Sequence, residues 1–213
     1  MLSACKIEEE TVLIKTVIFD IGNVLMEFSW WPYIRSLFDE DMAQIVTKAI
    51  WKNGYWDEFD RGVLTEAEIV KLMEDAAPEY SAEIHRTLDQ VGDCMHKHDY
   101  AIPWIKQLKE MGYQVVFLSN YSEFLMRIKP EVLDFLPYMD GGVFSCHVKL
   151  IKPDPAIYAA LCEKCNLKPE ESLFVDDNAA NIASAKEFGL HAIQFEGYEK
   201  SYDVVMNYLE KRR

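Results

Sequence analysis

The stretch VIFDIGNVL, residues 17–25, decides the fold of this 213-residue chain. Its first three residues, 17–19, are the end of an apolar segment at residues 12–19. This segment is rich in valine and isoleucine and predicts a buried strand. The strand ends at Asp20, and the chain then turns at Gly22. A carboxylate at the end of a buried strand is costly unless its charge has a use. Two questions follow: what Asp20 binds or attacks, and why a glycine stands two positions after it.

Strands and helices alternate along the chain from residue 102 onward. Gly112 and Gly189 are placed to end two of these helices, and Pro155 is placed to begin another. This alternation predicts an α/β fold with a Rossmann-like, three-layer α/β/α core, in which helices cover both faces of a parallel sheet. We expect strands at 113–120, 141–146, 172–178 and 191–195, and helices at 102–112, 121–128, 154–167 and 179–189.

The segment between the first strand and residue 99 has a different character, because its periodicity is helical throughout. Thr65 and Glu68 form a capping-box pattern at the start of one helix, and Ser81 is a candidate N-cap for another that extends to about residue 95. We therefore predict a core domain made of residues 1–28 and 99–213, with a helical domain inserted at residues 29–98.

The charge balance limits the partners of the protein. The net charge is −14, from 36 acidic and 22 basic residues, so neither nucleic acid nor an anionic membrane is expected as the main partner. A small anionic substrate is still compatible, because a local site can be positive on a negative protein. No apolar run reaches about 18 residues, which predicts no bilayer-spanning segment. We expect a monomer or a homodimer.

The N-terminus and the cysteines indicate the compartment. Residues 1–10 carry three glutamates where a signal peptide would have an apolar run, so none is expected. The number of cysteines is odd, which favours reduced thiols and a cytoplasmic protein. Two of them form a C-x-x-C pattern within a predicted helix, and without a second pair a zinc or redox role is not favoured. The five are Cys5, Cys94, Cys146, Cys162 and Cys165.

Polar residues follow three of the predicted strands, at the edge where ligands bind in parallel sheets. The first strand ends at Asp20, the next at Ser119-Asn120, and another at Asp176-Asp177. Lys152, in LIKPDP, precedes the helix that leads into the last of these. Each residue taken alone is explained as a turn residue, a helix cap or a surface lysine. Their convergence on one edge of the sheet favours a shared function.

The shared function that fits these side chains is a Mg²⁺ and phosphate site. Mg²⁺ prefers hard oxygen ligands, and Asp20 and Asp176 supply them with Asp177 close by. Ser119 and Asn120 are able to donate hydrogen bonds to phosphoryl oxygens, and a lysine offsets the negative charge. A carboxylate is then able to attack phosphorus and form an aspartyl-phosphate that water later hydrolyses.

Four segments in order resemble the motifs of the haloacid dehalogenase superfamily: VIFDIGNVL, VVFLSN, IKPDPAIY and LFVDDNAANIASAKEFG. The resemblance implies that the insert is a helical cap, of the type placed between motifs one and two. It implies that Asp20 is the nucleophile, Ser119 the phosphate-binding hydroxyl and Lys152 the charge-stabilising lysine. Asp176 and Asp177 are the implied metal-binding acids.

Gly22 departs from the usual pattern of phosphatases in this superfamily. They carry an aspartate two residues after the nucleophile, which protonates the leaving group and later activates water. At Gly22 only the backbone carbonyl is able to face the metal. Metal-independent haloacid dehalogenases also lack this aspartate, but they lack the paired acids of VDDN as well. A second subgroup, with FDLGNV and similar to alpha-D-glucose-1-phosphate phosphatase, matches more of the motifs.

We therefore predict a Mg²⁺-dependent phosphatase that hydrolyses a small phosphorylated metabolite, such as a sugar phosphate, through an aspartyl-phosphate. The alternatives are a haloacid dehalogenase and a non-enzymatic phosphoryl-binding or regulatory protein. Glu27 is a candidate replacement for the missing acid, although an ordinary structural glutamate is the favoured interpretation. Most aromatic residues of the insert are expected in its core, with one or two placed to stack on a substrate.

Overall fold

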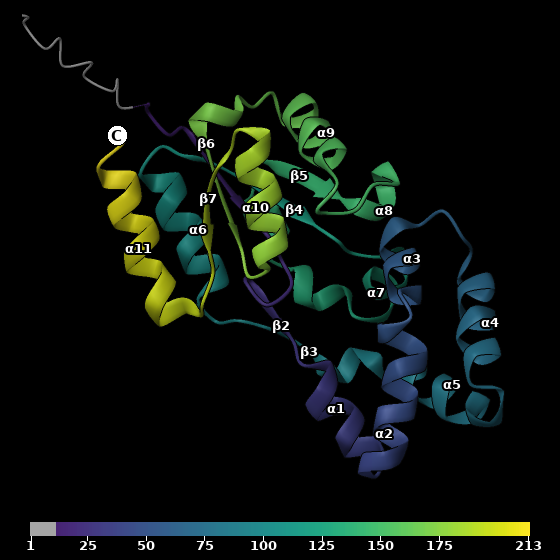
Figure 1. Ribbon diagram of the computed structural model, residues 1–213. Helices are drawn as coiled ribbons and strands as arrows, with labels where there is room; N and C mark the ends of the chain where they lie inside the picture. The colour runs from purple at the N-terminus through teal and green to yellow at the C-terminus, as the bar shows by residue number, and fades with distance from the viewer. Residues whose placement is uncertain (1–11) are drawn as a thin grey trace, which may run out of the picture.

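A computed structural model describes residues 12–213 of the chain (Figure 1). Cys5 and the N-terminal residues on which the signal-peptide expectation rests lie outside the described residues. The other four cysteines are free, as expected. Within residues 12–213, no helix has the length and apolar character needed to cross a membrane.

The centre of the molecule is a five-stranded parallel sheet with the order β5-β4-β1-β6-β7. The parallel α/β class predicted from the sequence is confirmed. Phe19, the last residue of β1, lies beside Phe117 of β4 and Val175 of β6, so the carboxyl ends of these strands meet at one edge. The strands are β1 (Thr16–Phe19), β4 (Gln114–Ser119), β5 (Gly141–Phe144), β6 (Ser172–Asp176) and β7 (His191–Gln194).

Helices cover both faces of the sheet. Successive residues of each strand point to opposite faces, so each strand presents side chains for helices to pack on at both faces. Phe19 packs on Trp104 of α6 (Ala101–Glu110), with ring centroids 4.7 Å apart, and α11 (Tyr198–Glu210) belongs to the same apolar cluster. On the other face Ile18 shares a separate cluster with residues of α9 (Pro155–Cys165) and α10 (Ala179–Phe188). Two apolar clusters on either side of one sheet make the three-layer core.

The predicted insert consists of helices that gather at one end of the molecule (Figure 1). Thr65 and Glu68 form the predicted capping box. The prediction that Ser81 caps a helix is wrong: it is the first residue of its helix, and its hydroxyl donates to Glu74. The helices are α1 (Trp30–Leu37), α2 (Glu40–Thr47), a π-helical turn (Lys48–Lys52), α3 (Tyr55–Arg61), α4 (Glu66–Ala76) and α5 (Ser81–Asp89).

A short antiparallel ribbon lies where the predicted insert joins the core. It pairs β2 (Met26–Phe28) with β3 (Met95–Lys97), and both strands were missed in the sequence. The expected helix at 81–95 therefore ends early, at Asp89, before a 3-10 turn (Val91–Cys94). The domain boundaries at 28/29 and 98/99 remain a prediction, and the ribbon shows that both chain crossings lie side by side.

Several short helical segments complete the fold. Asn120 is followed by a loop that leads into α7 (Glu123–Ile128), which is capped by the side chain of Ser122. Neither Ser119 nor Asn120 is therefore the cap of this helix. The remaining segments are α8 (Ser145–Val148) and the 3-10 turns Pro78–Tyr80, Pro130–Leu133, Leu136–Tyr138 and Pro169–Glu171.

Candidate active site

Asp20 lies immediately after β1 at the carboxyl edge of the sheet, and it is 7 % exposed. Its Oδ1 atom accepts a hydrogen bond from the backbone N–H of Ile21 at 2.7 Å and lies 2.9 Å from Nζ of Lys152. Burial raises the pKa of the Asp20 carboxyl to about 7, and the charge of Asp176 adds to this, while Lys152 acts in the opposite direction. The carboxyl is thus oriented through one oxygen atom.

Lys152 is the charge that holds the core acids together. Its ammonium is buried and donates to the carbonyl of Leu118 at 3.0 Å and to Oδ2 of Asp176 at 2.6 Å, in addition to its contact with Asp20. Burial alone would lower the pKa of Lys152, but the two carboxylates outweigh burial and raise it. A buried ammonium is stable only with such compensation. The alternative interpretation of Lys152 as an ordinary surface lysine is therefore excluded.

Asp176 and Asp177 end β6 and differ in their surroundings. Asp176 is fully buried, and its carboxylate accepts hydrogen bonds from the backbone N–H of Asn178 at 2.7 Å and from Nδ2 of Asn181 at 3.0 and 3.1 Å. Asp177 is partly exposed and accepts from Nδ2 of Asn23 at 3.2 Å. Burial, and then the charge of Asp176, raises the pKa of Asp177.

The three core carboxylates form a compact group of hard oxygen atoms. Ligand atoms of Asp20, Asp176 and Asp177 lie within 4.8 Å of one another. This donor set fits Mg²⁺, which takes one or two carboxylates and completes its shell with water and phosphate oxygens. Gly22 lines the cavity in front of the group. The structure therefore brings together the acids, the lysine and the glycine that the sequence singled out.

Asn120 and Ser119 lie at the same edge of the sheet, and their side chains contact the backbone of neighbouring residues. Oδ1 of Asn120 accepts from the backbone N–H of Lys152 at 2.8 Å, and its Nδ2 donates to the Lys152 carbonyl at 3.0 Å. This pair of hydrogen bonds fastens the lysine loop to the end of β4. Ser119 is buried, and its hydroxyl makes only a long contact, 3.5 Å, to the carbonyl of Asn120. Their roles toward phosphate remain predictions.

A cavity of about 240 Å³ opens between the strand ends and the insert. Sequence reasoning missed Asp60, an insert residue of α3 that lines it. Trp56, also on α3, is one of the insert aromatic residues of which one or two were expected to stack on a substrate. A usable signal existed: Trp56 and Asp60 are four residues apart and so fall on one helix face. The described lining is Asp20, Gly22, Asn23, Met26, Phe28, Trp56, Asp60, Asn120, Tyr121, Leu125, Lys152, Asp177, Asn178 and Asn181.

Asp60 also lines the cavity, but it is not one of the acids that Lys152 contacts, which are Asp20 and Asp176. It is 8 % exposed, and its Oδ1 atom has no hydrogen-bond partner among the described residues. Burial raises the pKa of the Asp60 carboxyl to about 8, with smaller contributions from the charges of Asp57 and Asp20, and Lys152 only partly offsets them.

Glu27 does not face the cavity. It is exposed on β2 and accepts a hydrogen bond from the hydroxyl of Ser29, which agrees with the structural interpretation of this glutamate.

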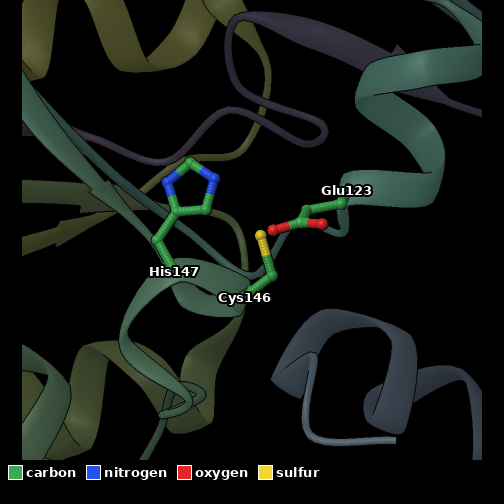
Figure 2. A group of neighbouring side chains, drawn as sticks. All are labelled: Glu123, Cys146 and His147. Atoms are coloured by element: carbon green, nitrogen blue, oxygen red, sulfur yellow. The ribbon is translucent and has the colours of Figure 1, made fainter. Parts of the chain in front are cut away.

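A second group of ligand-type side chains lies outside the cavity lining. Figure 2 shows the Cys146 sulfur beside the carboxylate of Glu123, with the ring of His147 on the other side of the sulfur. Burial raises the pKa of the Cys146 thiol to about 11, so it remains protonated near neutrality. A protonated thiol is a poor ligand, and the group does not match the oxygen donors that Mg²⁺ prefers.

The fold and the strand-edge site define the class of the protein: an α/β enzyme whose charged residues lie at the carboxyl ends of a parallel sheet. A family model described as haloacid dehalogenase-like hydrolase matches residues 14–189. The chain belongs to this family and is a hydrolase.

Individual relatives include enzymes of two activities. The chain is 25 % identical over 206 residues to D-ribitol-5-phosphate phosphatase from Bacteroides thetaiotaomicron, covering 92 % of this chain and 100 % of the relative. It is 24 % identical over 175 residues to (S)-2-haloacid dehalogenase 1 from a Pseudomonas strain, covering 82 % and 68 %.

A solved structure has the same fold. It is a haloacid dehalogenase family enzyme from Bacteroides thetaiotaomicron, in complex with magnesium and inorganic phosphate. The TM-score is 0.67 at 20 % identity, and the alignment covers 90 % of this chain and 98 % of that one.

Proposed function

We propose that the protein is a Mg²⁺-dependent phosphatase that hydrolyses a small phosphorylated metabolite through an aspartyl-phosphate on Asp20. The observation that carries the proposal is the group of three carboxylates, Asp20, Asp176 and Asp177, gathered around one buried lysine. A dehalogenase attacking a carbon–halogen bond has no need for this concentration of negative charge. A metal-dependent phosphatase does need it, because the carboxylates bind the metal ion and the metal offsets the negative charge of the carboxylates and of the phosphate.

The metal would be held by the carboxylates of Asp20, Asp176 and Asp177 and by the backbone carbonyl of Gly22. When bound, Mg²⁺ supplies positive charge that lowers the repulsion between a carboxylate and a phosphate. Asn181 and Asn23 fix the orientation of two of these ligands through the hydrogen bonds to Asp176 and Asp177.

The side chains of the protein perform the remaining steps. Oδ1 of Asp20 is engaged by the Ile21 N–H and by Lys152, which leaves Oδ2 as the attacking atom. Lys152 places a positive charge between Asp20 and Asp176, and this charge acts against the effect of burial on the pKa of the Asp20 carboxyl. Ser119, whose hydroxyl is only weakly engaged, and Asn120 are the proposed donors to the phosphoryl group.

The cavity supports a small substrate, and a sugar phosphate is our proposal for its class. Phe28 and Trp56 line the cavity and offer aromatic faces of the kind that sugars stack on, and one relative is a phosphatase of a sugar-alcohol phosphate. A cytoplasmic location, a monomer or homodimer, and the absence of nucleic-acid or membrane partners remain part of the proposal.

The test is turnover of a panel of sugar phosphates, an aryl phosphate and 2-haloacids, each measured with Mg²⁺ and with a chelator. The proposal predicts phosphate release that requires Mg²⁺. Halide release that survives the chelator would replace it with the dehalogenase activity. Tight binding of inorganic phosphate without turnover of any ester would favour the regulatory protein.

A further inference from the structure

Asp60 is a buried acid without a structural partner in a place where a substrate would lie. It stands on the last turn of α3 and lines the same cavity as Asp20 and Lys152. Its Oδ1 atom is buried and unpaired among the described residues, and the residue as a whole is 8 % exposed. A buried polar atom without a partner costs free energy, so its presence calls for an explanation.

The backbone at Asp60 is fastened to the core. The hydroxyl of Ser145 donates to the carbonyl of Asp60 at 2.6 Å and accepts from the backbone N–H of Tyr121 at 2.9 Å. Two residues further on, the carbonyl of Gly62 accepts from Nζ of Lys149. The end of α3 is thus held against α8 and against the loop after β4, beside the cavity that Asp20 and Lys152 also line.

The other titratable groups that line the cavity already have roles. Lys152 is committed to the Leu118 carbonyl and to two carboxylates. Asp20 and Asp177 belong to the core group of acids, and Tyr121 has its pKa raised by burial. Among the described lining residues, Asp60 is the remaining carboxyl able to exchange a proton.

We propose that Asp60 is the general acid and base of the reaction, in place of the aspartate that related phosphatases carry at the position of Gly22. The proposal rests on the phosphatase activity proposed above. It assigns a residue of the insert to the chemistry, whereas the nucleophile and the metal ligands come from the core.

Each step balances with one proton on Asp60. Oδ2 of Asp20 forms a bond to phosphorus, the bond from phosphorus to the ester oxygen breaks, and the proton of Asp60 passes to that oxygen to give an alcohol. Asp60, now a carboxylate, then takes a proton from water while the water oxygen bonds to phosphorus. The bond between phosphorus and Asp20 breaks, which regenerates the Asp20 carboxylate and protonated Asp60. The sum is ester plus water giving alcohol plus phosphate.

The protonation state of Asp60 agrees with this role. Burial raises the pKa of its carboxyl to about 8, so the acid form is present near neutrality, and an efficient general acid has a pKa near the working pH.

The experiment compares two substrates on the same preparation of Asp60→Asn: an alkyl phosphate, whose leaving group needs a proton, and 4-nitrophenyl phosphate, whose leaving group does not. We expect kcat/KM for the alkyl ester to fall by about 10²–10⁴-fold, with a much smaller loss for the aryl ester. The ratio of the two losses is independent of how much of the variant is folded. Asp75→Asn, which replaces an exposed acid of α4 that pairs with Lys71, is the control and should leave both rates unchanged.

Rescue gives a second readout that a structural role would not produce. A Cβ added at Gly22 meets no atom within 4 Å, so Gly22→Asp is accommodated. Introduced into Asp60→Asn, it should restore hydrolysis of the alkyl ester by at least about tenfold, because an acid again reaches the leaving group.

The results separate this inference from the proposed function. Equal losses for both esters in Asp60→Asn, or no loss for either, would overturn the role of Asp60 while the phosphatase activity stands. Failure of the wild-type protein to hydrolyse either ester with Mg²⁺ would instead overturn the proposed function.

Discussion

The core edge and the insert each bury carboxyl groups, and they do so in opposite ways. At the core edge, Asp20 and Asp176 share the buried ammonium of Lys152, and Asp176 accepts further hydrogen bonds from Asn178 and Asn181. In the insert, Asp60 is buried without a hydrogen bond to Oδ1. The first arrangement holds charge in place, and the second keeps a proton available.

This difference indicates that the core edge and the insert have different chemical roles in the site. The charge of Lys152 lowers the pKa of the Asp20 carboxyl and so favours its ionised form, which is able to bind a cation or attack phosphorus. Burial raises the pKa of the Asp60 carboxyl to about 8, which favours its acid form, and this form is able to donate a proton. We infer that the strand ends supply the nucleophile and metal ligands and that the insert supplies the acid.

Replacing Asp20 with Asn should abolish phosphatase activity, with a loss of at least about 10³-fold in kcat, because an amide is a poor nucleophile and a weaker metal ligand. The amide preserves the shape of the side chain and Asp176 still pairs with Lys152, so far-UV circular dichroism should stay near that of the wild type. Activity within tenfold of the wild type would remove Asp20 as the nucleophile.

Replacing Lys152 with Ala should destabilise the fold by about 3–5 kcal/mol, because it leaves two buried carboxylates without their counter-charge. Urea unfolding with chelator present measures this effect. Lys168→Ala, which removes an exposed lysine paired with Glu171 at 3.3 Å, is the control and should cost at most about 1 kcal/mol. Similar losses for the two variants would contradict the compensated core edge.

The stability of the protein should depend on pH through Asp60. Its pKa is about 8 in the folded protein against an ordinary 3.8, so the folded state binds the proton more tightly. Stability attributable to this group is therefore greatest below about pH 4 and decreases as the pH rises to about 8, by about 1.4 kcal/mol per unit of displaced pKa.

Asp60→Asn should flatten this decrease, which thermal or urea unfolding across that range would measure. The charges that influence the pKa of Asp60 are those of Asp57, Asp20 and Lys152, and the variant retains all three. It also retains Tyr121 and Cys146, the two groups whose pKa values are raised in part by Asp60. The difference between the two proteins thus isolates Asp60. Parallel curves for the wild type and the variant would show that the carboxyl is not held protonated.

Removing the Asn23 side chain should weaken Mg²⁺ binding by about tenfold without abolishing it. Asn23 orients Asp177 and has a φ of 56°, so glycine is the substitution that keeps the backbone conformation. Calorimetric titration of Asn23→Gly with Mg²⁺ measures the change directly. An unchanged affinity would mean that Asp177 does not need this orientation or does not bind the metal.

The core of the fold was predictable from the sequence because three of its strands, β1, β4 and β6, end in polar residues that carry a chemical signal. Asp20, Asp176 and Asp177 follow apolar strands, and the parallel topology that the alternation implies brings such ends together. The side-chain hydrogen bonds of Asn120 to the Lys152 backbone were not predictable, because they depend on how two loops pack rather than on either segment alone.

The insert was less predictable for the same physical reason. Asp60 lies in a helix with three other acidic or basic residues, and only packing against the core shows that it is buried rather than exposed. The ribbon of β2 and β3 was missed because each strand has only three residues and pairs with a partner far away in the sequence. Local patterns do not specify such contacts.

The most direct test of the central claim is an acid quench of the wild-type protein during turnover of a phosphate ester with Mg²⁺, followed by mass spectrometry of its peptides. We expect one phosphoryl group on the peptide that contains Asp20, seen with Mg²⁺ and lost with chelator or in Asp20→Asn. A phosphoryl group attached to a different residue would contradict it.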